Sequence, residues 1–573
     1  MEGIIISDLN QIIKNKDVLG AHGNSDTWFT VDYETDTIRG KMLTALETSH
    51  PEPIVLSPEL TGWYKIYHAR ITNDGSMTAY MRFSDEKMPT MIREGFFPRP
   101  PRENSFEWVE EQLWCCADLT GRDIVFHKHH KQDYYASIAW LRFVPMTEEE
   151  VAAYQAYMNP EGHRNLHVHY DNDCNLWDGS DEVEHAMLKL VQIKNDDVKI
   201  CTQEIMADNY DGRAITDHTK ALGWTAIVYN DENRKAALKQ GAIHAARREL
   251  IHSYGAKYYA GFRMSLASFS GSSQPLMQEY FCEAHPEFHM LTRDGRQVRI
   301  CSYAYKEVQD YVIELLVNNV KVHGFDGVSL ICHRGQMIGF EQPVLDECAR
   351  RFDGLDARLL PLGDPRLTEV HCAIMTDFII RLHENLDKAL GRHVPINMIV
   401  GYNAEVVGID CEALAKAGAI DHISQDSLEH TEPSKYHLRE DGLIDMEKYK
   451  YNLLNNYTVH RPLADSWERA KEAAIRYLAV SEKYGVEFFA GMTTHWYDDP
   501  MRYYNWNENL KALGVKNFSF YNHCHFVGLR GVCAIVGKAG REKIEPETYT
   551  MNFYRVLKLD GVDISTYLPQ WSE

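Results

Sequence analysis

The stretch "YVIELLVNNVKVHGFDGVSLICHR" (residues 311–334) joins a helical pattern, a glycine and a short apolar run. A glycine just past a helical pattern closes the helix, because it adopts the left-handed conformation without strain. The apolar run after Gly324 is typical of a strand buried in a parallel sheet. The stretch therefore predicts one helix–glycine–strand unit, whose strand runs directly into Cys332, His333 and Arg334.

The same unit recurs through the chain after residue 146. Helical patterns end at Gly255, Gly324, Gly391, Gly418, Gly485 and Gly514. Together with two earlier strands, "LHVHYD" (166–171) and "VKICTQE" (198–204), about eight strands alternate with helices. Eight such units in roughly 420 residues predict an α/β fold, a (β/α)8 TIM barrel with enlarged loops. An open doubly wound sheet is the structural alternative, but no glycine-rich phosphate turn follows the first strand.

Residues 1–146 have a different texture. Short aromatic and β-branched runs such as "GWYKIYHARI" (62–71) and "YYASIAWLRFVPM" (134–146) are separated by turn residues, which predicts a β-sandwich. Thr147 and Glu150 then form the pattern of a helix capping box. We therefore expect a sandwich domain at 1–146 and a barrel domain at 147–573.

Composition excludes several classes of partner. A formal net charge of −23 over 573 residues argues against a nucleic-acid or anionic-membrane partner, which would need a basic face. The first residues lack the pattern of a signal peptide, and no apolar run reaches the roughly 20 residues that span a bilayer. The cysteines form no CxxC pair, which favours reduced thiols and a cytoplasmic location. A homo-oligomer is the base-rate expectation.

Polar residues follow the predicted strands, where the active site of a (β/α)8 barrel lies. Hydrolysis of a glycoside needs two carboxyl groups, and we place them among Glu204, Glu341 and Asp426. Side chains at the same edge that suit sugar hydroxyls and ring faces are the candidate substrate-binding residues: Asp171, Arg263, His333, Arg334, Tyr402, Asn403, His495, Trp496 and His523.

Histidines at the same edge raise a metal-dependent alternative. Imidazoles and carboxylates from several strands could converge on one ion: His169, Glu204, His333, Asp426, His495 and His523. No HExxH or other short-range ligand spacing occurs, so no cofactor is predicted and a divalent metal remains the alternative. A nucleophilic Cys332 is not favoured, because its neighbour His333 would point to the opposite face of the strand.

The strand at 325–331 also carries a family resemblance. With Asp326, Gly327, Val328, Leu330 and Arg334 it resembles the family-10-like glycoside hydrolases, barrel proteins often preceded by a β-sandwich. "YYAGFRM" (258–264) is similar to the strand that delivers an inward arginine, here Arg263. "DLTGRDIVFHKHH" (118–130) and 134–146 resemble the closing strands of the sandwich.

One departure from this family shifts the expected chemistry. The resemblance implies an acid in the fourth strand, where this chain has Ile331. Catalysis would then rest on Glu204 and Asp426, with Glu341 as the replacement. Asp426 would be nucleophile or base and Glu204 or Glu341 the acid, or the reverse.

The expected function is a glycoside hydrolase, or a related carbohydrate-active enzyme, that cleaves an oligosaccharide or glycoside. The alternatives are a metal-dependent sugar isomerase, epimerase or lyase, and a barrel that binds carbohydrate without catalysis.

Overall fold

The structure is a computed structural model of the 573-residue chain. It describes residues 3–21, 26–46, 51–71, 78–93, 108–128, 136–159, 161–170, 187, 190–205, 240–264, 281–282, 285–332, 337–360, 364–426, 467–493, 500–521, 538–541 and 552–559.

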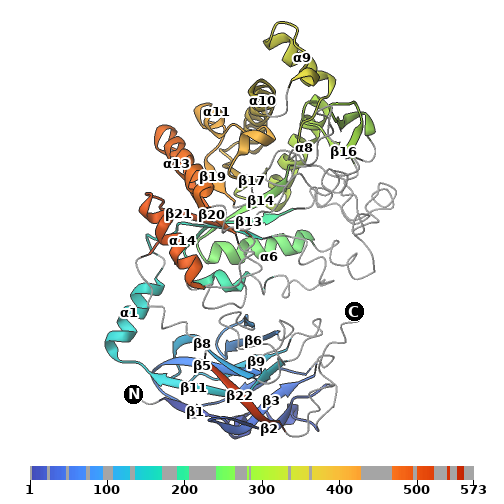
Figure 1. The fold of residues 1–573 in the computed structure, drawn as a ribbon. Helices are drawn as coiled ribbons and strands as arrows, with labels where there is room; N and C mark the ends of the chain where they lie inside the picture. The colour runs from blue at the N-terminus through green and yellow to red at the C-terminus, as the bar shows by residue number, and fades with distance from the viewer. Residues whose placement is uncertain are drawn as a thin grey trace.

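Eight parallel strands close into a barrel (Figure 1). In order around the barrel they are β12 (Leu166–Tyr170), β13 (Val198–Glu204), β14 (Lys257–Arg263), β17 (Gly327–Ile331), β18 (Ile396–Val400), β19 (His422–Gln425), β20 (Glu487–Thr493) and β21 (Asn517–Tyr521). β12 pairs with both β13 and β21, so the ring has no open edge. The predicted (β/α)8 barrel is confirmed in its closed parallel sheet.

Helices alternate with these strands along the chain. They are α6 (Gln240–Ser253), α8 (Lys306–His323), α9 (Gln342–Arg351), α10 (Pro365–Leu390), α11 (Cys411–Lys416), α13 (Trp467–Tyr484) and α14 (Pro500–Ala512). A hairpin of β15 (His289–Leu291) and β16 (Gln297–Cys301) precedes α8. Short 3-10 turns lie at Val191–Asn195, Pro286–Phe288, Ala357–Leu359 and Ala404–Val407.

The glycines that closed the predicted helices have the backbone conformation that this role requires. Gly324 ends α8 with a φ of 68°, and its N–H donates to the carbonyl of Val320. Positive φ is found at all six predicted positions: Gly255, Gly324, Gly391, Gly418, Gly485 and Gly514. The helix stops read from the sequence are therefore confirmed.

The N-terminal region consists of two antiparallel sheets. One has the order β1 (Ile4–Ile6), β11 (Trp140–Pro145), β5 (Trp63–Ile71), β8 (Trp108–Asp118), β22 (Asn552–Leu559), β2 (Phe29–Thr35), β3 (Arg39–Ala45) and β10 (Ala136–Ile138). The other has the order β4 (Ile54–Leu56), β9 (Ile124–His127), β6 (Thr78–Phe83) and β7 (Thr90–Arg93). Short 3-10 turns lie at Leu9–Gln11 and Lys16–Val18. Buried apolar side chains of both sheets form one cluster, whereas the β-sandwich itself stays a prediction.

β22 comes from the far end of the chain. In Figure 1 it lies as a red strand among the blue strands of the larger sheet, between β8 and β2. Tyr554 on β22 packs edge-on against Trp140 of β11, with ring centroids 4.9 Å apart. The sequence interpretation assigned residues 552–559 to the barrel domain, and the structure puts them in the N-terminal sheet. The division at residue 146 otherwise stays a prediction.

α1 (Glu148–Met158) links the two parts of the chain. The predicted capping box is confirmed, because Thr147 accepts from the N–H of Glu150 while the Glu150 side chain accepts from the N–H of Thr147. At the other end of the helix, Arg541 donates to the carbonyl of Tyr157 and pairs with Asp197, which is fully buried. These contacts fix α1 against the start of β13.

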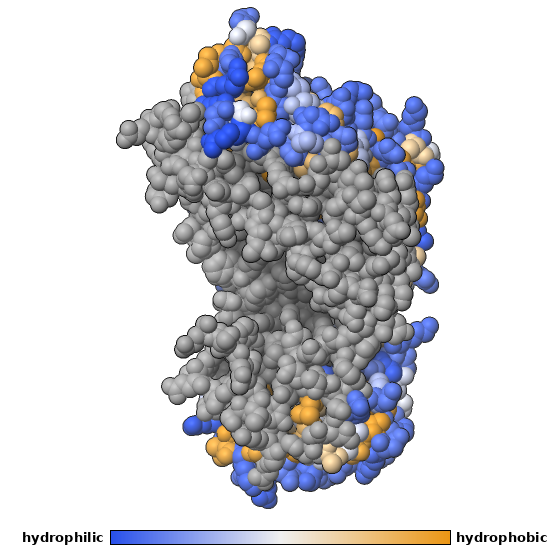
Figure 2. Space-filling view, turned by 90° about the vertical axis from the view of Figure 1, so that its right-hand side faces the viewer, coloured by the Kyte–Doolittle hydropathy of each residue, from blue (hydrophilic) through white to orange (hydrophobic). Residues whose placement is uncertain are grey.

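The described surface carries few large apolar side chains. Those that are exposed are Ile4, Ile5, Val322, Leu359, Ile475 and Leu557. On the face drawn in Figure 2, the described residues near the two ends are mostly hydrophilic, with apolar side chains in small groups. Among the helices that the structure describes, none has the length and apolar character needed to cross a membrane.

Candidate active site at the carboxyl end of the barrel

Side chains of the barrel strands alternate between two environments. Leu330 and Met398 belong to the large apolar cluster that also takes in residues of the surrounding helices. Ser329 and Asn397 are also fully buried, yet they bond to each other, Asn397 Nδ2 donating to Ser329 Oγ at 3.1 Å. Because successive side chains of a strand point to opposite faces, these polar residues face the barrel interior.

A hydrogen-bonded chain of polar side chains crosses this interior. Its members are His167, Thr202, Ser329, Asn397, Ser424 and Ser519, from six of the eight strands. The ring of His167 lies 2.9 Å from Ser519 Oγ and 2.8 Å from Thr202 Oγ1. Burial, together with neighbouring His169 and His422, holds the pKa of His167 well below its usual range. A neutral ring can donate at one nitrogen and accept at the other, as two hydroxyl partners allow.

A glycine makes room for part of this chain. Thr202 Oγ1 and Ser329 Oγ are 2.7 Å apart, although β14 lies between their strands. β14 contributes Gly261 at this level, and a Cβ there would lie 2.7 Å from Cγ2 of Thr202. The interior is therefore a packed polar layer, and the residues two positions further along each strand form its upper surface.

Glu204 lies on that upper surface and is held by its two neighbouring strands. Its Oε2 accepts a hydrogen bond from Nε of Arg263 at 2.6 Å, and its Oε1 lies 2.9 Å from Nε2 of His169. His169, Glu204 and Arg263 come from β12, β13 and β14, and only the arginine side chain has appreciable exposure, 20%. A guanidinium hydrogen bond on one oxygen and an imidazole beside the other favour the charged form of a carboxylate. This arrangement suits a base, a nucleophile or a charge-stabilising group.

Asp426 follows β19, four strands away from β13 in a ring of eight. β13 and β19 are therefore opposite walls of the barrel. Asp426 is 2% exposed, and its N–H donates to the carbonyl of Val400 at 2.7 Å. Two residues after Ser424, its position belongs to the inward-facing set of β19. Two predicted catalytic carboxyl groups, those of Glu204 and Asp426, thus stand at the same end of the barrel on opposite walls.

Glu341, the third predicted carboxylate, is engaged by the neighbouring backbone. Its Oε1 accepts from the N–H of Leu291 at 2.7 Å, and its Oε2 accepts from the N–H of Gly339 at 3.0 Å and from Ser302 Oγ at 2.8 Å. The residue is fully buried at the start of α9. This geometry favours a structural role, in which Glu341 fixes the β15–β16 hairpin to the beginning of α9.

Two other predicted substrate-binding residues lie just after β18. Tyr402 is 4% exposed and belongs to the apolar cluster between strands and helices, so its ring packs there. Its carbonyl accepts from Arg476. Asn403 begins the short turn Ala404–Val407 and is partly exposed. The remaining candidates lie outside the described residues: Asp171, His333, Arg334, His495, Trp496 and His523.

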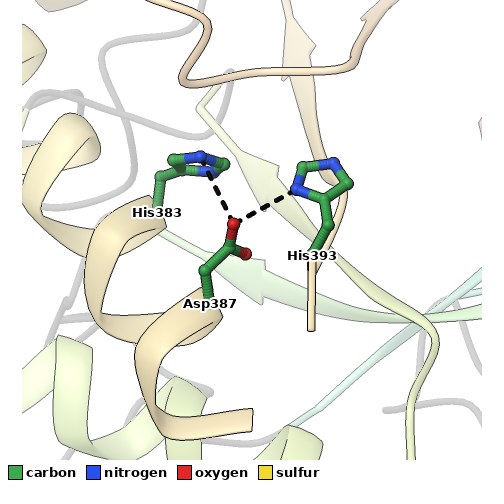
Figure 3. A group of neighbouring side chains, drawn as sticks. All are labelled: His383, Asp387 and His393. Atoms are coloured by element: carbon green, nitrogen blue, oxygen red, sulfur yellow. Dashed lines mark hydrogen bonds and ion pairs between the residues drawn. The ribbon is translucent and has the colours of Figure 1, made fainter. Parts of the chain in front are cut away.

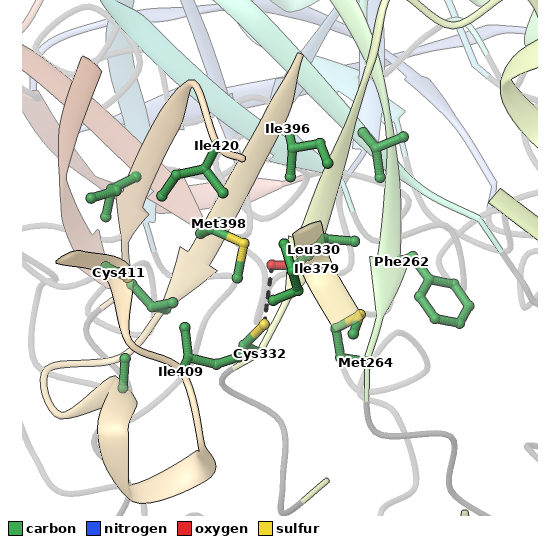
Figure 4. Packing of buried hydrophobic residues seen from close by; sticks show 14 of the residues in the cluster. Phe262, Met264, Leu330, Cys332, Ile379, Ile396, Met398, Ile409, Cys411 and Ile420 are labelled. Atoms are coloured by element: carbon green, nitrogen blue, oxygen red, sulfur yellow. Dashed lines mark hydrogen bonds between the residues drawn. The ribbon is translucent and has the colours of Figure 1, made fainter. Parts of the chain in front are cut away.

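Cys332 follows β17 directly, and its thiol points into the apolar cluster between strands and helices. Cys332 is 1% exposed and lies in the apolar cluster, close to Met264, Ile409 and Cys411 in Figure 4. Its Sγ donates weakly to the carbonyl of Leu330 at 3.6 Å, and burial raises the pKa of the thiol. Ile331, paired in register with Arg263, occupies the alternate, inward side. The wall beside Arg263 is thus apolar at the position where the family resemblance implied an acid.

The interior polar layer was missed from the sequence, although a signal was present. One or two polar residues interrupt otherwise apolar strands in "LHVHY", "GVSLI", "INMIV" and "NFSFY". A strand buried on both faces is expected to be almost wholly apolar. Polar residues within several of these strands therefore indicate an interior hydrogen-bonded layer below the candidate site.

Comparison with known proteins adds likenesses of low similarity. No protein-family model matches the chain, and no curated relative was found. Among solved structures, the β-amylase catalytic domain from Paenibacillus polymyxa is 9% identical, with a TM-score of 0.39 over 66% of this chain and 98% of that one. An α-galactosidase from Thermus thermophilus is 11% identical, with a TM-score of 0.35 over 90% of this chain and 96% of that one. A chitinase from Rhizomucor miehei is 11% identical, with a TM-score of 0.30 over 65% of this chain and 99% of that one. At these values the likenesses carry no argument about activity, and the barrel rests on its own strand pairing.

Proposed function

We propose that the carboxyl end of this barrel is the active site of a carbohydrate-active enzyme, and more narrowly of a glycoside hydrolase. The observation that supports the proposal most directly is the buried carboxylate of Glu204, held by Arg263 and His169 at the inner edge of the strands. A fixed carboxylate with a second one, that of Asp426, on the opposite wall of the barrel is the pair that most glycoside hydrolases use.

The contacts of the two carboxyl groups favour different roles for them. Arg263 and His169 stabilise a negative charge on Glu204, which suits a nucleophile or a base. Asp426 would then be the general acid that protonates the leaving oxygen. This reverses the first assignment drawn from the sequence, and it leaves Glu341 with its structural contacts.

The positions of Glu204 and Asp426 on opposite walls also bear on the stereochemical outcome of hydrolysis. Carboxyl groups about 5–5.5 Å apart are typical of retaining enzymes, and those about 6.5–9.5 Å apart of inverting enzymes. Residues on β13 and β19 face each other across the full width of the barrel. We propose the wider spacing and an inverting reaction, in which Glu204 activates a water molecule.

The proposal also covers the role of the N-terminal sheets, the cellular location and the oligomeric state. The two antiparallel sheets would form the predicted β-sandwich, with β22 as an added strand, and would assist carbohydrate binding. A cytoplasmic location and a homo-oligomer belong to the same proposal.

The test is a screen of aryl glycosides and oligosaccharides with purified protein, in buffer with and without EDTA. Glu204→Gln and Asp426→Asn should each lower kcat by about 10²–10⁴-fold, the usual contribution of a positioned acid or base. Glu412→Gln is the matched control, because Glu412 is exposed and pairs with Lys483 on the helix layer. NMR of the first-formed anomer would decide between inversion and retention.

Two results would contradict this assignment. If both variants keep full turnover, the two-carboxylate mechanism is wrong. If turnover disappears in EDTA and returns with a divalent ion while circular dichroism stays unchanged, the metal-dependent alternative is favoured.

A further inference from the structure

Two histidines and an aspartate meet at the opposite end of the barrel from Glu204. His383 and Asp387 lie four residues apart on the last turns of α10, and therefore on one helix face (Figure 3). Gly391 closes the helix with a φ of 65°. The chain then turns back, and His393 arrives beside Asp387 just before β18.

The three side chains have the spacing of ligands around one ion. Each offers one donor atom, and these atoms all lie within 4.8 Å of one another. Oδ2 of Asp387 lies 3.3 Å from Nδ1 of His393 and 3.7 Å from Nε2 of His383. Zinc–ligand bonds of about 2.0–2.1 Å around a tetrahedron place neighbouring donors about 3.3–3.4 Å apart. Small rotations of the rings would bring all three donors to one centre.

A second carboxylate orients one of the rings. Nε2 of His393 lies 2.8 Å from Oδ1 of Asp421, so its Nδ1 faces Asp387. A histidine that binds a metal through one nitrogen commonly donates its other N–H to a carboxylate. Asp421 has this outer position, and its Oδ2 is fixed by the N–H of Ile396.

The aspartate is also fixed before any ion binds. Oδ1 of Asp387 accepts from the N–H of Val394 at 2.8 Å, which leaves Oδ2 directed at the two rings. His383, Asp387 and His393 are each partly exposed to solvent, so an ion can enter from outside. Two imidazoles and one carboxylate are donors that suit Zn²⁺ and its neighbours rather than Ca²⁺ or Mg²⁺.

We propose that His383, Asp387 and His393 form a binding site for a divalent transition metal such as Zn²⁺. Three protein ligands leave a fourth position for water. The site joins the last turn of α10 to the start of β18 at the amino end of the barrel, where side chains serve stability rather than catalysis. It is distinct from the carboxyl-end residues of the proposed active site and does not depend on that proposal.

The experiment measures zinc binding to the full chain, stripped of metal beforehand, by competition with a chromophoric chelator. The variants are His383→Gln and Asp387→Asn, the second of which keeps an oxygen for the N–H of Val394. His252→Gln is the matched control, because His252 is also a partly exposed histidine paired with a carboxylate, that of Asp326 at 2.7 Å.

We expect the wild-type chain and His252→Gln to bind one zinc ion with the same Kd. Loss of a ligand in His383→Gln or Asp387→Asn should weaken this binding more than about 100-fold, and Asp421→Asn about 10–100-fold, the usual effect of an outer partner. Co²⁺ should show the visible absorption of a four-coordinate site in the wild type and in His252→Gln, and not in His383→Gln or Asp387→Asn. Equal Kd values in wild type and His383→Gln, or no stoichiometric zinc in the wild type, would overturn the proposal.

Discussion

Arg263 Nε and Glu204 Oε2 are 2.6 Å apart, on neighbouring strands at the carboxyl end of the barrel. The contact is a charge-assisted hydrogen bond, shorter than a typical neutral one. With His169 on the other oxygen, it fixes the carboxylate of Glu204 on the layer above the interior polar chain.

Replacement of Arg263 by glutamine should destabilise the protein through Glu204. The carboxylate would remain buried after losing its positive partner, at a cost of about 1–3 kcal/mol. A second change, Glu204→Gln in the same chain, should recover part of the loss because the uncompensated charge is removed. Urea unfolding of the two single variants and the double variant measures the coupling. Strictly additive effects would show that the two side chains do not interact energetically.

Replacement of Gly491 by alanine should disturb the wall next to Asp426. A Cβ at Gly491 would lie 1.5 Å from the carbonyl oxygen of Gln425 and 3.0 Å from Cα of Asp426, which is backbone and cannot rotate away. Overpacking typically costs about 1–3 kcal/mol, and we expect a loss at or above the upper end. Gly261→Ala is the comparison, because its nearest contact is a side-chain methyl of Thr202 at 2.7 Å. A smaller loss of unfolding free energy for Gly491→Ala than for Gly261→Ala would contradict this ranking.

Removal of β22 should destabilise the larger N-terminal sheet. β22 pairs with β8 and β2, so a chain that ends at residue 550 would expose two unpaired strand edges, a known cause of aggregation. Trp140 would also lose its contact with Tyr554. A chain that ends at residue 559 keeps the strand and serves as control. We expect a lower Tm and lower solubility for the shorter chain only, and equal values for both would show that β22 is dispensable.

The sequence predicted the repeating elements better than the long-range contacts. A glycine such as Gly324 closes a helix through local backbone geometry, so its effect is visible in a few neighbouring residues. β22 has no such local signature, because its pairing with β2 joins residues such as Tyr33 and Leu559 from opposite ends of the chain. Strand periodicity can at most indicate a strand and does not name its partner.

The candidate site was also predictable in part: the positions of strand-end residues could be predicted, but the contacts of loop residues could not. The rule that strand ends form the active site correctly brought His169, Glu204 and Arg263 to one edge of the barrel. It could not show that Glu341, in a following loop, directs its carboxylate to backbone N–H groups. The direction of the Glu341 carboxylate depends on how the β15–β16 hairpin packs against this loop. Such tertiary packing has no signature in the local sequence.

The structural role of Glu341 has a pH signature. Burial raises its pKa above the ordinary value of 4.5, although hydrogen bonds from Leu291, Ser302 and Gly339 act in the opposite direction. A carboxyl group with a raised pKa in the folded state contributes its full stability below the unfolded pKa, and that contribution declines as the pH rises through the folded pKa. The contribution of Glu341 to the stability of the protein should therefore decline as the pH rises from 4.5 through the raised pKa of this group.

Glu341→Gln removes the titrating group but leaves an amide of similar size. The substitution should lower the free energy of unfolding by about 1–3 kcal/mol. The reason is that the new amide NH2 group is a donor and lies opposite N–H and O–H donors, to which the carboxyl oxygens of Glu341 act as acceptors. The cost should be largest near pH 4.5 and shrink toward neutral pH, where the wild type has lost the pH-dependent part. Urea unfolding of both proteins across this range measures the difference directly. A cost that grows with pH would mean that the folded protein binds the ionised form of Glu341 more favourably than the protonated one, and would reverse the sign argued from its burial.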